Sequence, residues 1–85
     1  MERKITLRLT SKEVGLLAKR VAGMLEIEFG ELPLKLTDVR LVILAVNADT
    51  PRAWYKVKDT RLYKRSPDLF KRTVEVVEIS FRDIS

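Results

Sequence analysis

The hydrophobic pattern of the first third of the chain predicts a strand followed by a helix. Residues 3–9, RKITLRL, alternate polar and apolar side chains, as a strand with one buried face does. Thr10 follows, and Glu13 stands three residues later, which is the spacing of a capping box at a helix start. Apolar residues then recur every three or four positions, so we predict an amphipathic helix over about 11–26. The stripe expected to face the core comprises Val14, Leu17, Ala18, Val21 and Leu25.

The middle of the chain contains its most apolar stretch. Residues 34–46, LKLTDVRLVILAV, have apolar side chains on both faces if the backbone is extended. The β-branched residues of this stretch, which favour strands, are Val39, Val42, Ile43 and Val46. We therefore prefer a central strand over 38–48 that is covered on both sides. A buried helix that begins at Asp38 is the alternative, because periodicity alone does not separate the two for a short apolar run.

The next segment, residues 52–65 with the sequence RAWYKVKDTRLYKR, follows the turn formers NADTP. Val57 and Leu62 fall on opposite faces of a straight strand, so a strand through this segment has to bend or turn between them. A tight hairpin turn at Asp59 and Thr60 is disfavoured, because neither residue is Gly or Asn. We predict a bulged or bent strand here.

The C-terminal part predicts a short helix and a last strand. Ser66, Pro67 and Asp68 combine an N-cap residue, a first-turn proline and an acid near the positive end of a helix. The helix has space for about two turns before the next element. Residues 73–81, TVEVVEISF, then read as a strand with a change of phase near Val76.

The predicted order of elements is β-α-β-β-(short α)-β, which indicates the α+β class. We expect an antiparallel or mixed four-stranded sheet with one long and one short helix, for which a ferredoxin-like arrangement is the first choice. With 85 residues the chain has space for a single domain, 1–85. One long helix covers one face of such a sheet, while two strands are apolar on both faces. We therefore expect a homo-oligomer, most simply a homodimer.

Positive charge is concentrated in one quarter of the chain. The net charge is +5 for the whole chain, +1 for residues 1–50, +6 for residues 51–72 and −2 for residues 73–85. A localised basic segment attracts phosphate-bearing partners to one part of a protein surface. The composition thus directs attention to the segment 51–72.

Composition also excludes several functions. The chain has no Cys and no His, which removes disulfides, thiol nucleophiles, the commonest general base and the usual zinc ligands. No Gly-rich phosphate loop occurs, so we expect no cofactor, no metal and no enzymatic activity. The carboxylates that could in principle serve catalysis are interpreted as solvated, capping or turn residues: Glu26, Glu28, Glu31, Asp38, Asp49 and Asp59.

The cellular setting is predicted from the same composition. The longest apolar run has six residues, too few to cross a membrane, and the charged N-terminus does not resemble a signal peptide. We expect a cytoplasmic protein that does not bind membranes. Gln is absent and Asn occurs once, whereas Lys and Arg number 17, a balance that fits a thermophilic source.

The most specific function that this charge pattern favours is binding of nucleic acid, DNA or RNA. Lys and Arg neutralise phosphates, and Trp and Tyr stack on unpaired bases. The candidate cations are Arg52, Lys56, Lys58, Arg61, Lys64, Arg65, Lys71 and Arg72. The candidate stacking residues are Trp54, Tyr55 and Tyr63.

Two other interpretations of these residues stay open. The cations also suit an exposed edge strand that is protected from aggregation, and the aromatics also suit a core or a dimer contact. Aromatic residues and Arg are in addition common in protein interfaces, so a structural or protein-interaction role, in assembly or with an acidic partner, is the main alternative to nucleic-acid binding.

The N-terminus suggests a further DNA-binding arrangement. An alternating strand with Lys4, Thr6 and Arg8 on its polar face, followed by a capped helix, resembles the opening of ribbon-helix-helix proteins. In that family, paired strands of a dimer enter the major groove. The resemblance covers about 25 residues and implies a second helix soon after the first. A strand over 38–48 that follows a long connection does not satisfy this requirement, whereas a helix there, together with pairing of the N-terminal strands across a dimer, would favour it.

Overall fold

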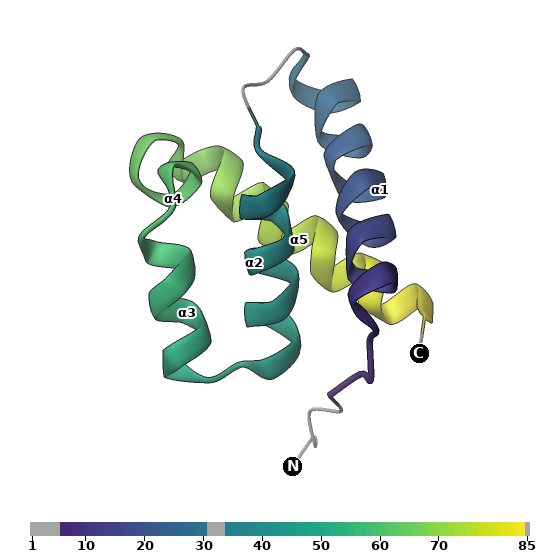
Figure 1. Cartoon of the computed structure of the whole chain (residues 1–85). Coiled ribbons are helices and arrows are strands. Elements are labelled where there is room, and N and C mark those ends of the chain that lie inside the picture. Colours follow the sequence, from purple (N-terminus) through teal and green to yellow (C-terminus); the bar gives the residue numbers. More distant parts are fainter. Residues whose placement is uncertain (1–5, 31–33, 85) are drawn as a thin grey trace.

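The chain folds as a bundle of helices. The computed structural model describes residues 6–30 and 34–84, and these contain no strand. The helices are α1 (Ser11–Phe29), α2 (Leu36–Ala48), α3 (Pro51–Lys58), α4 (Arg61–Arg65) and α5 (Pro67–Ile84). α1, α2 and α3 lie side by side with alternating direction, and α5 crosses behind α1 and α2 (Figure 1). The predicted α+β class and its ferredoxin-like arrangement are therefore wrong.

Helix α1 was predicted correctly at its start and along its buried face. The Thr10 N–H donates to Glu13 Oε1 (3.0 Å), and the Glu13 N–H donates to Thr10 Oγ1 (3.1 Å), which confirms the capping box. Hydrogen bonding from the Thr10 backbone, and then from its side chain, lowers the pKa of the Glu13 carboxyl, because these bonds favour the charged form. All five residues of the predicted stripe are buried. The helix ends at Gly30, whose positive φ of 82° suits a residue without Cβ.

Helix α2 occupies the segment for which a strand was preferred, so that prediction is wrong and the helical alternative is confirmed. Val39, Val42, Ile43 and Val46 are all buried, and they lie at i, i+3, i+4 and i+7, the spacing of one helical face. A β-branched residue costs up to about 0.7 kcal/mol in a helix relative to Ala. Burial of such a side chain contributes about 1.5–3 kcal/mol. Packing against neighbouring helices therefore outweighs the strand preference.

The predicted bent strand over 52–65 is instead two short helices, α3 and α4. Thr50 caps α3 by accepting from the Ala53 N–H (3.2 Å), and Thr60 caps α4 by accepting from the Tyr63 N–H (3.2 Å). Val57 and Leu62, which conflicted in phase on one strand, belong to different helices and are both buried. The phase break is thus the junction between α3 and α4.

Helix α5 begins as predicted and extends much further than predicted. Pro67 is its first residue, and the Phe70 N–H donates to the carbonyl of Ser66 (2.8 Å). The helix continues to Ile84 through the segment 73–81, so the predicted last strand is wrong. Its buried residues are Thr73, Val76, Val77 and Ser80, again at i, i+3, i+4 and i+7. The hydroxyl groups of Thr73 and Ser80 donate to carbonyls four residues earlier, which satisfies them inside the core.

One core joins all five helices, and it changes the argument for a dimer. Val42, Val46 and Val76 are buried within the chain, and Val74 packs against the same core. The partner was expected because Val42, Leu44, Val46, Val74 and Val76 needed apolar cover on a second face of the sheet, and of these five Leu44 alone is exposed. The bundle itself therefore supplies most of the cover that was assigned to a second subunit, and the homo-oligomer stays a prediction.

The segment before α1 is attached to the end of α2. The Leu7 N–H donates to Asn47 Oδ1 (2.8 Å), and Asn47 Nδ2 donates to the Leu7 carbonyl (2.9 Å). Residues 6–10 form no strand, and Lys4 lies outside the described residues. The two helices that the ribbon-helix-helix resemblance implies are present as α1 and α2, while pairing of N-terminal segments across a dimer stays a prediction.

None of the helices in residues 6–30 and 34–84 is both long enough and apolar enough to cross a bilayer.

The packing of α1 leads to a stability prediction. Leu25 is fully buried and Ile27, on the same helix, is 88% exposed. We expect Leu25→Ala to lower the free energy of unfolding by about 2–5 kcal/mol, because it leaves a cavity in the core. Ile27→Ala changes it by less than about 0.5 kcal/mol. Chemical denaturation followed by far-ultraviolet circular dichroism measures the free energy of unfolding of both variants. If the two substitutions lower it equally, this orientation of α1 is wrong.

Candidate nucleic-acid interface

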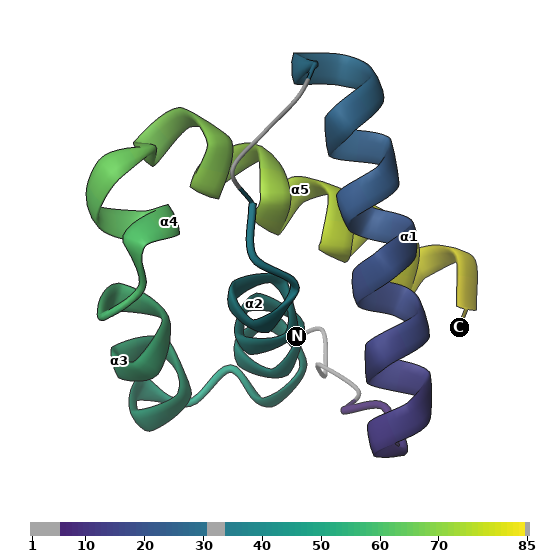
Figure 2. The ribbon, with the colours of Figure 1, turned by 45° about the horizontal axis from the view of Figure 1, so that its top comes forward.

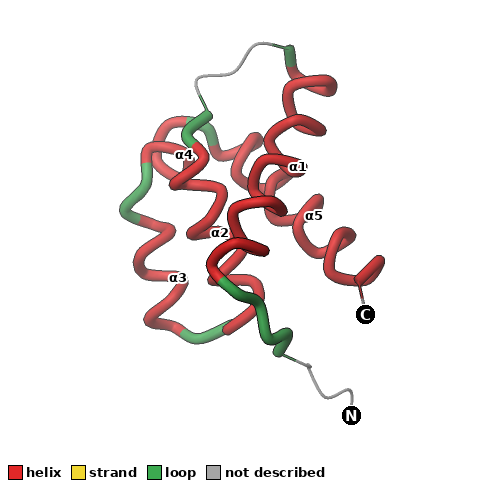
Figure 3. Tube along the Cα trace, turned by 45° about the vertical axis from the view of Figure 1, so that its right-hand side comes forward, coloured by secondary structure: helices red, strands yellow, loops and turns green. Residues whose placement is uncertain are grey.

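The basic segment forms one side of the bundle. Its residues lie on α3, α4 and the first part of α5, and α3 and α4 stand at the edge of the molecule next to α2 (Figure 1). The loops that join α2 to α3 and α3 to α4 are short (Figure 3). Residues 51–65 contain six basic side chains and one acidic side chain, so the net charge of this segment, +5, equals that of the whole chain.

Helix α3 has a sharply divided surface. Val57 is buried, and Ala53 and Trp54 are half-buried against the core. The exposed charged and aromatic residues are Arg52, Tyr55, Lys56 and Lys58. Tyr55 is 73% exposed, and the Lys58 ammonium lies 5.9 Å from the centroid of its ring. The exposed part of α3 therefore presents three cations and one aromatic ring with no carboxylate among them. Arg52 and Lys56, four residues apart, lie toward α2, whereas Tyr55 and Lys58, three residues apart, lie together on another side of the helix.

Helix α4 adds three cations on one face. Arg61, Lys64 and Arg65 lie at i, i+3 and i+4, so their side chains leave the same side of the helix. Lys64 forms an ion pair with Asp59 (3.7 Å). Both partners of that pair are largely exposed, so it contributes little to stability. Among the described residues, Arg61 and Arg65 form no such pair.

Arg72, which the sequence assigned to the site, is engaged with two carboxylates of the chain. Its Nε lies 3.0 Å from both carboxylate oxygens of Glu28, and its Nη1 lies 3.2 Å from Glu75. Hydrogen bonding and Coulomb attraction from Glu28, with a further hydrogen bond from Glu75, raise the pKa of Arg72. This cluster links the end of α1 to α5. Lys71, its neighbour in sequence, is exposed.

Two of the three candidate stacking residues are engaged within the chain. The Trp54 indole N–H donates to Asp49 (3.0 Å), the residue that ends α2 in the left-handed conformation with a φ of 51°. Tyr63 packs edge to face on Phe70, with ring centroids 4.9 Å apart. Tyr55 is thus the best placed of the three for stacking on a base.

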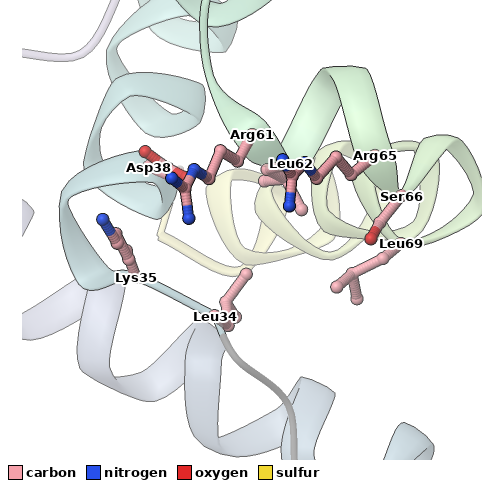
Figure 4. A pocket seen from close by; sticks show the side chains of 8 residues that line it. All are labelled: Leu34, Lys35, Asp38, Arg61, Leu62, Arg65, Ser66 and Leu69. Carbon is pink, nitrogen blue, oxygen red and sulfur yellow. The ribbon is translucent and has the colours of Figure 1, made fainter.

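Two pockets open along the side of α2 that faces α3 and α4. The first, about 220 Å³, is lined by Lys35 and Asp38 from the start of α2, by Arg61 and Arg65 from α4, and by apolar residues that include Leu34 (Figure 4). The second, about 280 Å³, is lined by the latter part of α2 and by Arg52 and Lys56 of α3. Since Asp38 lines one pocket and Leu41 the other, the two follow one another along α2.

The charges around these pockets are unbalanced. Five cations line them: Lys35, Arg52, Lys56, Arg61 and Arg65. Asp38 is the one acidic residue in either lining. Within the described part of the chain, none of the five cations has a carboxylate oxygen within 4.0 Å. The arrangement can therefore attract a polyanion without first breaking an ion pair.

Lys35 is the residue that sequence reasoning missed. It precedes α2 and stands far from the basic segment along the chain, yet it lines the same pocket as Arg61 and Arg65. No local signal distinguishes it from other exposed lysines, because its position depends on how α4 packs beside the start of α2.

Comparison with family models, with curated proteins and with solved structures finds no match to this chain. The function therefore has to be argued from the geometry. Among the described residues no group of three or more His, Cys, Asp or Glu side chains is placed to hold a metal ion.

The structural role of Arg72 leads to a prediction. We expect Arg72→Gln to lower the melting temperature, because it leaves Glu28 and Glu75 without their cation, and we expect added salt to reduce the difference from wild type. Lys71→Gln, with the same change of charge at an exposed position, is the matched control and leaves the melting temperature nearly unchanged. Differential scanning calorimetry at two salt concentrations distinguishes the variants. If both substitutions change the melting temperature by the same amount, the ion pairs of Arg72 do not stabilise the fold.

Proposed function

We propose that the chain is a non-catalytic nucleic-acid-binding protein that uses α3 and α4. The observation that carries the proposal is the exposed part of α3, which presents Arg52, Lys56 and Lys58 without a carboxylate and places Lys58 beside the exposed ring of Tyr55. Arg61 and Arg65 continue the positive surface onto α4. Trp54, Tyr63 and Arg72 make contacts within the chain, so we propose a smaller site than the one that the sequence suggests.

Backbone contact is the expected mode of binding. Lys and Arg that contact phosphates release condensed counterions, and this term supplies most sequence-independent affinity. A single exposed aromatic ring, Tyr55, is available for stacking, which adds affinity for unpaired bases without reading their sequence. The surface therefore suits binding with little sequence preference and a strong dependence on salt.

The decisive experiment is a titration of fluorescent single- and double-stranded oligonucleotides, followed by anisotropy at two salt concentrations. We expect Arg52→Gln/Lys56→Gln/Lys58→Gln to weaken binding at least about tenfold. We also expect the slope of log affinity against log salt to become shallower by about 0.9 for each duplex phosphate that the variant no longer neutralises. These side chains are exposed, so the variant retains the helical circular dichroism of the wild type.

A matched control separates a local site from general attraction to a positive protein. Lys12, Lys19 and Arg20 are exposed on α1, which lies on the other side of α2 from α3 (Figure 1). Lys12→Gln/Lys19→Gln/Arg20→Gln removes the same charge and is expected to change affinity less than about threefold. If the two triple variants lose oligonucleotide affinity equally, or if the wild type binds no oligonucleotide at low salt, the proposed site is excluded.

Protein interaction is a second candidate function, and it has its own observation. The side of α1 that faces away from the core exposes three large apolar side chains, Leu16, Met24 and Ile27. Such a face suits contact with a second copy of the chain, which agrees with the expected homo-oligomer.

Sedimentation velocity over a range of protein concentrations tests this second function. If α1 mediates self-association, Ile27→Glu returns the protein to a monomer while the α3 triple variant does not. A monomer at all concentrations removes self-association as the role of this face.

A further inference from the structure

The pocket between α2, α4 and the start of α5 brings together hydrogen-bond donors from three parts of the chain. Lys35 comes from the start of α2, Arg61 and Arg65 come from α4, and Ser66 stands between α4 and α5. Figure 4 shows Arg61 extended toward Asp38, with Lys35 on one side of it and Arg65 and Ser66 on the other. Donors from three parts of the chain therefore line one pocket.

These donors are chemically suited to a phosphate group. Arg presents several N–H groups in a planar fork that matches the oxygens of a phosphate, while Lys supplies a point charge and a hydroxyl supplies one more donor. The pocket, of about 220 Å³, is several times larger than the roughly 30 Å³ that a water molecule occupies in the liquid. It therefore has space for a tetrahedral anion together with part of its hydration.

The balance of charge in the pocket favours a terminal phosphate over a bridging one. Lys35, Arg61 and Arg65 against Asp38 give the lining a formal charge of +2. A phosphate monoester carries a charge of about −1.5 to −2 at neutral pH, whereas a phosphodiester of a nucleic-acid backbone carries a single negative charge per phosphate. The dianion thus compensates the lining more completely.

The position of the pocket connects it to the surface of α3. The second pocket, where Arg52 and Lys56 stand, is lined by the next turns of the same helix α2. A strand that lies against α3 and α4 therefore extends toward the first pocket. An end of the strand is better suited to the pocket than its middle, because the pocket is a hollow and the face of α3 is open.

We propose that this pocket binds the terminal phosphate monoester of a nucleic-acid strand, with Arg61 and Arg65 as the principal donors. The inference rests on the proposed function and makes it more specific: α3 contacts the backbone, and the pocket recognises a phosphorylated end. Asp38 limits the affinity, because its carboxylate faces Arg61 and competes with the phosphate.

The experiment compares oligonucleotides of one sequence that carry a 5′-phosphate, a 3′-phosphate or only hydroxyl ends. Anisotropy titrations are made with the full chain at low salt. We expect one of the phosphorylated ends to raise affinity by roughly tenfold, the size expected for charge-assisted contacts. Arg61→Gln/Arg65→Gln abolishes this preference. The matched control Arg52→Gln/Lys56→Gln weakens all three oligonucleotides and keeps the preference.

A variant that is expected to bind more tightly is also informative, because a folding defect would weaken binding and could not imitate the expected gain. Asp38→Asn removes the competing charge, and we expect it to strengthen binding of the phosphorylated end about threefold or more without a similar effect on the hydroxyl end. Inorganic phosphate is the second probe: in nuclear magnetic resonance titrations it shifts the amides of Lys35, Arg61, Arg65 and Ser66 before others, and Arg61→Gln/Arg65→Gln removes these shifts.

The outcomes separate this inference from the function on which it rests. If the oligonucleotides bind equally well with and without a terminal phosphate, the pocket is not a phosphate site and the function of α3 stands. If inorganic phosphate binds in the pocket but no oligonucleotide binds, the nucleic-acid function is overturned, and so is the assignment of the phosphate to the end of a strand. If Arg61→Gln/Arg65→Gln still prefers the phosphorylated oligonucleotide, the terminal phosphate binds elsewhere on the protein, and the inference is overturned.

Discussion

Burial of α2 among its neighbours is the constraint on which the rest of the structure depends. α2 packs against α1 on one side, α3 on the other and α5 behind, and Val39, Val42 and Ile43 are fully buried in these contacts (Figure 2). Burial of each such side chain stabilises the fold by about 1.5–3 kcal/mol, which exceeds the propensity cost of a β-branched residue in a helix. α1, α3 and α5 take their positions from this central helix, and α4 packs against α5 and α3.

The candidate site follows from the position of α2. The chain turns at Asp49 and Thr50, and so α3 is held beside the latter part of α2 while α4 returns toward its start. Lys35, at that start, thereby joins the cations of α4 around one pocket. The inner faces of α3 and α4 supply Val57 and Leu62 to the core, so the basic residues between them are left on the outside.

The basic residues of the segment divide into two groups with different roles. Arg72 is held by Glu28 and Glu75 and connects α1 to α5, whereas Arg61 and Arg65 border a pocket with a single acid in its lining. An ion-paired cation costs energy to redirect toward a new ligand, while one without a partner is available at once. Residue type and position along the chain do not reveal this difference.

Some features were predictable from the sequence because their physical cause is local. The capping box of Thr10 with Glu13 and the Ser66-Pro67 helix start involve residues a few positions apart, and both are confirmed. Thr50 followed by Pro51 is the same kind of start signal at α3, but its turn-forming neighbours favoured a turn instead. The spacing of the buried residues of α2 and α5 likewise matches a helix, although their β-branched side chains favour a strand.

By itself the sequence determined where helices can begin, which faces are apolar and that positive charge gathers in residues 51–72. These properties depend on neighbours along the chain. Only the tertiary structure decided that the β-branched segments are helical, that Arg72 is paired, and that Lys35 stands with Arg61 and Arg65. Each of these outcomes depends on contacts between residues far apart in sequence, whose energies exceed local preferences and appear in no local pattern.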